Sequence, residues 1–116
     1  MLVIEIKSVK QFQEVIKKYR VVVVDVWTSW CSPCIKYKPV FRDVARDYES
    51  LNYVVFCTLN PEDSEELFNF VINELKVTEV PTTIVFVNGK EEKRVKGYMG
   101  RDALKSIVNS CIELTS

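Results

Sequence analysis

Apolar residues along the chain follow two spacings, and the order of these spacings predicts strands alternating with helices. Short apolar runs typical of buried strands occur at residues 2–6, 21–27, 53–60 and 81–87. After the first three runs, and again near the C-terminus, apolar residues recur every three or four positions, as on the inner face of a helix. The run at 21–27 is interrupted only by Asp25 and predicts a central strand covered on both faces.

Turn and capping signals fix where several of these elements begin and end. Asn88-Gly89 is a strong two-residue turn and joins 81–87 to 90–98 as a hairpin. Ser8 followed by Gln11 is a capping box for the first helix, and Pro61 opens the third. The order β-α-β-α-β-α-β-β-α predicts an α/β fold with a mixed five-stranded sheet and helices on both faces.

Length and composition favour one domain over residues 1–116. Of the 116 residues, 47% are hydrophobic, which is enough for one sizeable core. Acidic and basic residues number 16 each, so charge gives no indication of nucleic acid or a membrane surface as partner. No apolar run approaches the roughly 20 residues that cross a bilayer. We therefore expect a soluble, cytoplasmic protein without membrane or nucleic-acid partners.

The stretch WTSWCSPCIK places Cys31 and Cys34 where the central strand gives way to a helix. Free backbone N–H groups and the positive end of the helix dipole favour a thiolate at Cys31. Because the thiolate is the reactive form of cysteine, Cys31 is the expected nucleophile and Cys34, one turn later, the resolving thiol. Pro33 lacks an amide proton, which costs nothing in a first turn.

Two other uses of the pair are less favoured by the sequence. A structural zinc site needs four ligands, but Cys57 and Cys111 stand alone and the chain has no histidine. A purely structural disulfide that closes so short a loop would add little stability. A reactive dithiol, without metal or other cofactor, is therefore the preferred interpretation.

The segments VVDVWTSWCSPC, EVPTTIVFVNGK and VKGY resemble the thioredoxin family across essentially the whole chain. The resemblance implies a thioredoxin fold and an enzyme, a protein-disulfide reductase. In that activity Cys31 attacks a client disulfide, Cys34 displaces the reduced product, and a Cys31–Cys34 disulfide remains. The implied partners are client proteins with disulfides and a thioredoxin reductase that recycles the dithiol, and we expect a monomer.

The same resemblance assigns roles to residues around the pair. Asp25 corresponds to a buried aspartate that passes a proton to or from the resolving cysteine. Pro81 is expected to have a cis peptide bond and to lie against the dithiol, which leaves the backbone of Val80 free to pair with an extended client. The expected substrate-binding residues are Trp30, Ser32, Pro33, Val80, Pro81 and Gly97.

Several positions depart from the family pattern. Ser32 and Ile35 replace the usual glycine and lysine, and we expect them to tune the reduction potential and the choice of clients. An exposed Ile35 would favour apolar clients, whereas inward packing is the alternative. The usual lysine beside the aspartate is replaced by Thr58, or by Cys57 if the strand slips by one residue. Neither residue carries a positive charge, so we expect Asp25 to titrate higher than it would beside an ammonium.

The sequence leaves alternatives open for the role of Cys57 and Cys111 and for the activity of the protein. Cys57 and Cys111 are expected to be small buried hydrophobes too distant to form a disulfide, with an accessory redox role for Cys57 as the alternative. The same site residues would also serve a disulfide oxidase or isomerase. A binding or assembly domain with an incidental or metal-binding CxxC is the alternative of another class, since a fold alone does not establish a function.

Overall fold

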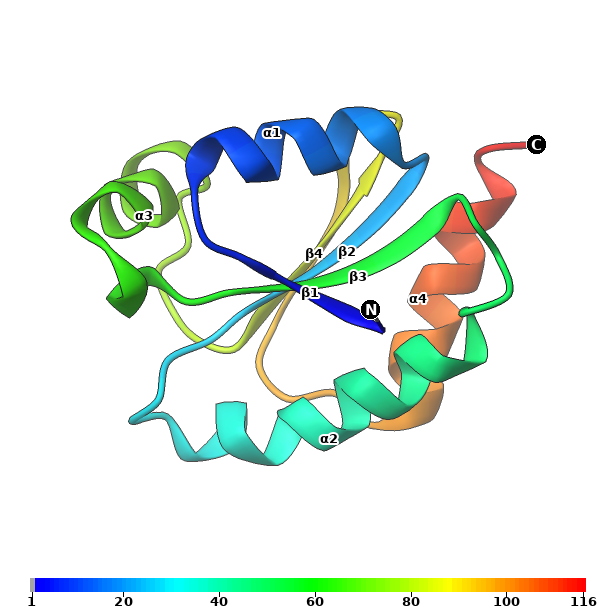
Figure 1. Cartoon of the computed structure of the whole chain (residues 1–116). Helices are drawn as coiled ribbons and strands as arrows, with labels where there is room; N and C mark the ends of the chain where they lie inside the picture. The colour runs from blue at the N-terminus through cyan, green and yellow to red at the C-terminus, as the bar shows by residue number, and fades with distance from the viewer. Residues whose placement is uncertain (1) are drawn as a thin grey trace.

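Five strands form one mixed sheet between two layers of helices in the computed structural model, which describes residues 2–116 (Figure 1). The strands are β1 (Val3–Ile6), β2 (Val21–Val26), β3 (Val54–Leu59), β4 (Thr82–Val87) and β5 (Lys90–Lys96). The helices are α1 (Val9–Lys18), α2 (Ser32–Asp47), α3 (Glu65–Asn69) and α4 (Arg101–Glu113). The predicted order of strands and helices is confirmed.

The strand order β1-β3-β2-β4-β5 makes β2 the centre of the sheet. β2 runs parallel to β3 and antiparallel to β4, and all six of its residues are buried. Asp25 on β2 pairs in register with Thr58 on β3, so Thr58 rather than Cys57 occupies the position opposite the carboxylate. α1 and α3 cover one face of the sheet, and α2 and α4 cover the other (Figure 1).

Each face of the sheet has its own apolar core. On the α2 and α4 face, the Phe41 ring packs edge-on against Phe56 with centroids 5.2 Å apart, beside Leu104 and Val108. Burying one such aromatic side chain stabilises the fold by roughly 1.5–3 kcal/mol. This packing fixes the rotation of α2, so the residues one and two turns before Phe41, including Cys34, also face the sheet.

Local signals in the sequence explain the ends of several elements. The Ser8 hydroxyl accepts a hydrogen bond from the Gln11 N–H (3.1 Å), and the Gln11 side chain accepts one from the Lys7 N–H (2.7 Å). Asn88 and Gly89 both have positive φ, 52° and 81°, as a hairpin turn of this kind requires. The capping box and the hairpin are confirmed.

The third helix differs from the expectation that it begins at Pro61. Pro61–Asp63 is a separate 3-10 turn, in which the Asn60 side chain accepts a hydrogen bond from the Glu62 N–H (2.8 Å). α3 begins only after Ser64, whose hydroxyl caps it, and it continues as a π-helix over Phe70–Glu74. The side chains of Asn60 and Ser64 therefore cap two separate helices, whereas Pro61 and the acidic residues after it predicted a single one.

Cys57 and Cys111 lie in different cores, on opposite faces of the sheet. Both are buried, and neither forms a disulfide within the described part of the chain. The expectation that they cannot bridge is therefore confirmed. No helix within residues 2–116 has the length and apolar character needed to span a membrane.

Candidate active site

The two cysteines of the CxxC stretch lie at the N-terminus of α2 and form a disulfide, with alpha carbons 5.2 Å apart. Cys31 is the N-cap residue, and its sulfur accepts a hydrogen bond from the Cys34 N–H (3.2 Å). Pro33 occupies the first turn, where no amide donor is needed. Cys31 therefore lies among the free N–H groups and at the positive end of the helix, an environment that stabilises a thiolate after reduction.

The two sulfurs differ in their access to solvent. Cys34 is completely buried, whereas 6% of Cys31 is exposed. Trp30, directly before Cys31, is 74% exposed and forms part of the surface around it. A disulfide that approaches from solvent therefore reaches Cys31 first.

The loop before β4 lies against the dithiol. The Val80–Pro81 peptide bond is cis, and the Val80 carbonyl oxygen lies 3.5 Å from the Cys31 sulfur. The Pro81 carbonyl oxygen accepts a hydrogen bond from the Gly97 N–H (2.7 Å). Gly97 has a φ of 93°, a conformation that glycine adopts without steric cost, so the chain can turn here beside the site.

An open apolar groove of about 600 Å³ extends from Cys31 toward α3. Its apolar lining includes Trp30, Pro33, Val80, Phe68 and Ile72. Phe68 and Ile72 are large exposed side chains on α3 and the π-helix after it, and they were not among the expected substrate-binding residues. The signal was available, because Leu67 and Val71 already supply the buried face of that helix.

On the other side of the dithiol, Ile35 and Tyr98 complete the apolar rim. Both are about half exposed, which excludes the alternative that Ile35 packs inward. Ser32 lies between them and the groove, in contact with solvent at the first turn of α2. The rim and the groove together surround Cys31 with apolar surface.

Asp25 lies at the end of β2, buried beneath α2. Neither of its carboxylate oxygens has a hydrogen-bond partner among residues 2–116. Burial raises the pKa of Asp25 from its ordinary 3.8 to about 7, while the positive charge of Lys38 acts in the opposite direction. A carboxyl with this pKa can both accept and release a proton near neutral pH.

A polar row crosses the sheet at the level of Asp25. The strand registers align Glu5 on β1, Thr58 on β3, Asp25 on β2 and Thr83 on β4. The Thr83 hydroxyl is hydrogen-bonded to the Tyr37 hydroxyl of α2 (2.8 Å). This row faces α2, so the sheet is polar beneath the helix end that carries the dithiol.

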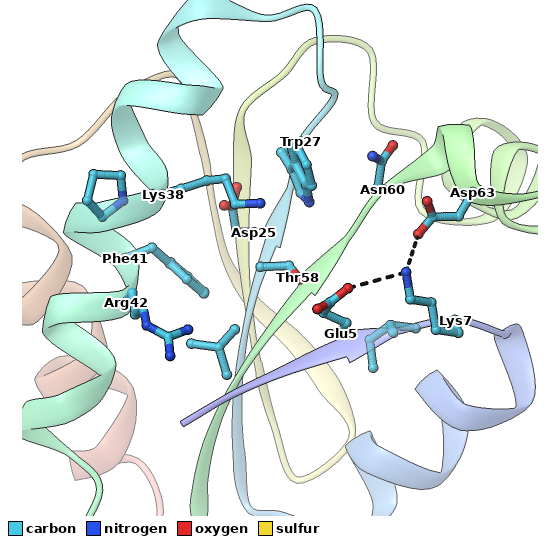
Figure 2. Close-up of a pocket in the computed structure, with 13 residues that line it drawn as sticks. Glu5, Lys7, Asp25, Trp27, Lys38, Phe41, Arg42, Thr58, Asn60 and Asp63 are labelled. Carbon is cyan, nitrogen blue, oxygen red and sulfur yellow. Dashed lines mark hydrogen bonds and ion pairs between the residues drawn. The ribbon is translucent and has the colours of Figure 1, made fainter. Parts of the chain in front are cut away.

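A cavity of about 480 Å³ opens beside Asp25, between α2 and the β1 edge of the sheet (Figure 2). At its outer end Lys7 forms ion pairs with Glu5 (3.3 Å) and Asp63 (3.1 Å). The lining of the cavity mixes polar and charged side chains with apolar ones, and its volume is large enough to hold water. Asp25 is one of the residues that line the cavity, and its two carboxylate oxygens are buried.

Lys38 on α2 extends toward Asp25 in the same view (Figure 2). Its ammonium nitrogen lies 3.5 Å from the centre of the Trp27 ring, a cation–π contact. Thr58 leaves β3 without a charge at this level, as predicted, and the pKa of Asp25 is raised. The positive charge of Lys38, which comes from α2, was not predicted. The spacing of four residues from Cys34 could have indicated Lys38, because such residues share a helix face.

Comparison with known proteins agrees with this site. The sequence model of the Thioredoxin family matches residues 3–110. A thioredoxin from Mycoplasma genitalium is 31% identical over 109 residues, which cover 94% of this chain and all of that protein. A bifunctional thioredoxin reductase/thioredoxin from Mycobacterium leprae is 32% identical over 101 residues, 87% of this chain and 21% of that longer protein.

Solved structures show the same similarity. A thioredoxin from Malassezia sympodialis superposes with a TM-score of 0.78 at 28% identity, covering 93% of this chain and 89% of that one. A Plasmodium falciparum thioredoxin superposes with a TM-score of 0.79 at 24% identity, over 92% and 97% of the two chains, which supports the fold alone.

Proposed function

This chain belongs to the thioredoxin family and is a protein-disulfide reductase, and on that premise we propose the role of each residue in its reaction. Cys31 is the attacking nucleophile, Cys34 the resolving thiol and Asp25 the proton carrier. The observation that carries this assignment is the position of the pair: Cys31 caps α2 and borders the surface, whereas Cys34 is completely buried on the inner side of α2.

The reaction transfers two electrons from the reduced dithiol to a client. The Cys31 thiolate attacks one sulfur of the client disulfide, the client S–S bond breaks, and one client thiolate leaves. A mixed disulfide now joins Cys31 to the other client sulfur. Cys34 then gives its proton to the Asp25 carboxylate and attacks Cys31, so the Cys31–Cys34 bond forms and the second client thiolate leaves. The protonated Asp25 releases its proton to water in the adjoining cavity.

The apolar groove binds the client segment around its disulfide. The free backbone of Val80 pairs with an extended client strand, and the cis Pro81 and Gly97 hold that backbone beside Cys31. Trp30, Ser32 and Pro33 complete the binding surface at the first turn of α2. The apolar character of the groove favours client segments with apolar residues next to the cysteine.

The oxidised protein needs a separate source of two electrons and two protons, which we assign to a thioredoxin reductase. The fused relative from Mycobacterium leprae carries both activities in one chain, which supports this partner. A reducing compartment such as the cytoplasm suits a dithiol that must be kept reduced. Because the proposed reaction requires only residues of a single domain, we propose that the protein acts as a monomer with one domain over residues 1–116.

Reduction of the interchain disulfides of insulin, driven by dithiothreitol, tests the assignment. Cys31→Ser should abolish catalysis, and Cys34→Ser should accumulate a stable mixed disulfide through Cys31 that mass spectrometry identifies. Equal rates for wild type and Cys31→Ser would contradict the proposal and favour a binding domain. Equilibration with glutathione measures the reduction potential of the Cys31–Cys34 pair. A potential as high as that of a strong oxidant would instead favour an oxidase.

A further inference from the structure

Asp25 meets several charged and titratable groups, and Lys38 is the cation aimed at it. On β1, Glu5 lies at the far end of the polar row, and Lys7 is paired with Glu5 and Asp63 at the outer end of the cavity. β3 and β4 contribute the uncharged hydroxyls of Thr58 and Thr83 at this level. From α2 come Tyr37, Lys38 and, farther along the helix, Arg42. Figure 2 shows Lys38, and not Arg42, extending toward the carboxylate.

The position of Lys38 is fixed from two sides. Cys34 and Phe41 lie on the buried, sheet-facing side of α2, and half-buried Lys38 borders that side and lines the cavity. The ammonium stacks on the Trp27 ring at 3.5 Å, which holds it at the wall of the cavity. No ion pair within 4.0 Å joins it to Asp25 in the described structure, so it acts on the carboxylate through space and leaves both oxygens free for a proton.

We propose that Lys38 is a positioning residue for the resolving step, which supplies from α2 a positive charge that favours the ionised form of Asp25, the form that can take the proton of Cys34. This proposal rests on the proposed role of Asp25 as proton carrier. When Asp25 accepts that proton, the Cys34 sulfur becomes the nucleophile and the Cys31–client bond breaks. Lys38 keeps its own proton throughout and forms no bond to the reacting atoms.

Two opposing effects set the pKa of the Asp25 carboxyl. Burial disfavours the charged form of Asp25, and a nearby ammonium favours it. Removing the ammonium should raise the pKa of Asp25 above about 7. A smaller fraction of the carboxyl would then be ionised at neutral pH, so fewer molecules could deprotonate Cys34.

The experiment follows each half of the reaction in one mixing event. Reduced protein is mixed with the aromatic disulfide dithiobis(nitrobenzoate), which releases one coloured thiolate when Cys31 attacks and a second when Cys34 resolves the mixed disulfide. Lys38→Met keeps the apolar stem and removes the charge, and Lys38→Arg keeps the charge. Lys36→Met is the matched control, since Lys36 lies on the same helix but near Tyr98 on the other side.

In Lys38→Met we expect the pH profile of the second release to move up by about one unit, the low end of the effect of a close opposite charge. The second release is then about tenfold slower than wild type near pH 6 and close to wild type near pH 9, with the first release unchanged. Lys38→Arg and Lys36→Met should keep the wild-type profile. Adding Thr58→Lys to Lys38→Met should restore it, because the new ammonium lies opposite Asp25 on β3.

Carbon NMR of the Asp25 carboxyl gives a second readout, which should move to a higher pKa in Lys38→Met alone. An unchanged profile of the second release, together with an unchanged Asp25 titration, would overturn the proposal. Failure of the proposed function would give a different result from failure of this proposal. If the proposed function were wrong, Cys31→Ser would still release thiolate at the wild-type rate. A slower second release at every pH would show a structural role and would also overturn the proposal.

Discussion

Asp25 is the residue at which stability and catalysis compete. Its side chain is fully buried and both of its oxygens lack a hydrogen-bond partner among residues 2–116. A buried ionised carboxylate without such partners is costly, and here the protein lowers the cost by raising the proton affinity of the group. The catalytic role proposed for Asp25 requires the ionised form, so the site operates at the expense of the folded state.

Replacing Asp25 by asparagine should therefore stabilise the protein above neutral pH. The pKa of Asp25 is 3.8 in a model peptide and about 7 in the folded protein, so between these values the folded state holds a proton that the unfolded state has lost. The free energy of unfolding of the wild type should fall across that window, by on the order of 4 kcal/mol, and stay level above it. The free energy of unfolding of oxidised Asp25→Asn, measured by urea unfolding, should not fall across this window. At pH 8 the variant should therefore be more stable than the wild type.

Exposed carboxylates provide the control for that measurement. Glu14→Gln on the outer side of α1 should leave the pH dependence as it is in the wild type. If Asp25→Asn and the wild type lost stability in parallel between pH 4 and 7, the carboxylate would not be the cause. The two proteins should be equally stable near pH 4, where Asp25 is protonated in the folded protein.

At the scale of elements, α3 and the π-helix after it form one wall of the apolar groove in which we propose that clients bind. Phe68 is 52% exposed and lines the groove that begins at Cys31, whereas Leu67 beside it is buried in the core. The segment therefore has an inner face that holds the fold together and an outer face available to clients. Of the two faces, only the outer one can change without loss of core packing.

Phe68→Ala should weaken client binding without changing the chemistry of the dithiol. In insulin reduction we expect KM to rise several-fold with kcat nearly unchanged, because the lost contact is equally present in the bound client and in the transition state. Reaction with dithiobis(nitrobenzoate), which is too small to need the groove, should keep its wild-type rate. Leu114→Ala is the matched control, since Leu114 is 56% exposed at the far end of α4. A fall in kcat with constant KM would contradict this role for Phe68.

The sequence predicted those elements whose ends depend on short-range chemistry. The Ser8 cap, the Asn88-Gly89 turn and the buried run of β2 each depend on a few neighbouring residues, and all are present in the structure. The division of the third helix was missed because Asn60 and Ser64 each cap a helix of their own, and only the second of these helices places Leu67 in the core.

At the scale of the molecule, the sheet separates two cores, and each holds one cysteine besides the dithiol pair. Cys57 lies on the α1 side, where burial raises its pKa to about 12, and Cys111 lies on the α4 side. Neither thiol is positioned to meet a client, and neither can form the thiolate readily at neutral pH. This placement keeps the exchange chemistry at one end of the molecule.

Alkylation of the reduced native protein should therefore modify Cys31 alone in the first phase. Cys34, Cys57 and Cys111 are almost wholly buried and should react with iodoacetamide only when the chain opens. Intact-mass analysis should show one added group under native conditions and four in denaturant, and peptide mapping should locate the first at Cys31. Early labelling of Cys57 would instead support the accessory redox role.

The site itself was only partly predictable, for a reason that concerns the whole molecule. Cys31, Cys34, Asp25 and Pro81 belong to recognisable segments, whereas Lys38 matters only because α2 is rotated to face Asp25 across the polar row. Phe68 and Ile72 likewise join the site through the path of the chain after β3. Relations between side chains on separate elements depend on packing angles that one sequence does not specify.

The two margins of the sheet bear on how clients are selected. β1 is only four residues long, and β5, at the opposite margin, carries the exposed and mostly charged sequence KEEKRVK. Short and charged edge strands resist the addition of a further strand. An extended polypeptide therefore finds little to pair with along either margin, whereas the backbone at Val80 is the position at which we propose that a client adds a strand. On that proposal, the edge protection that prevents aggregation would also direct unfolded chains toward the dithiol.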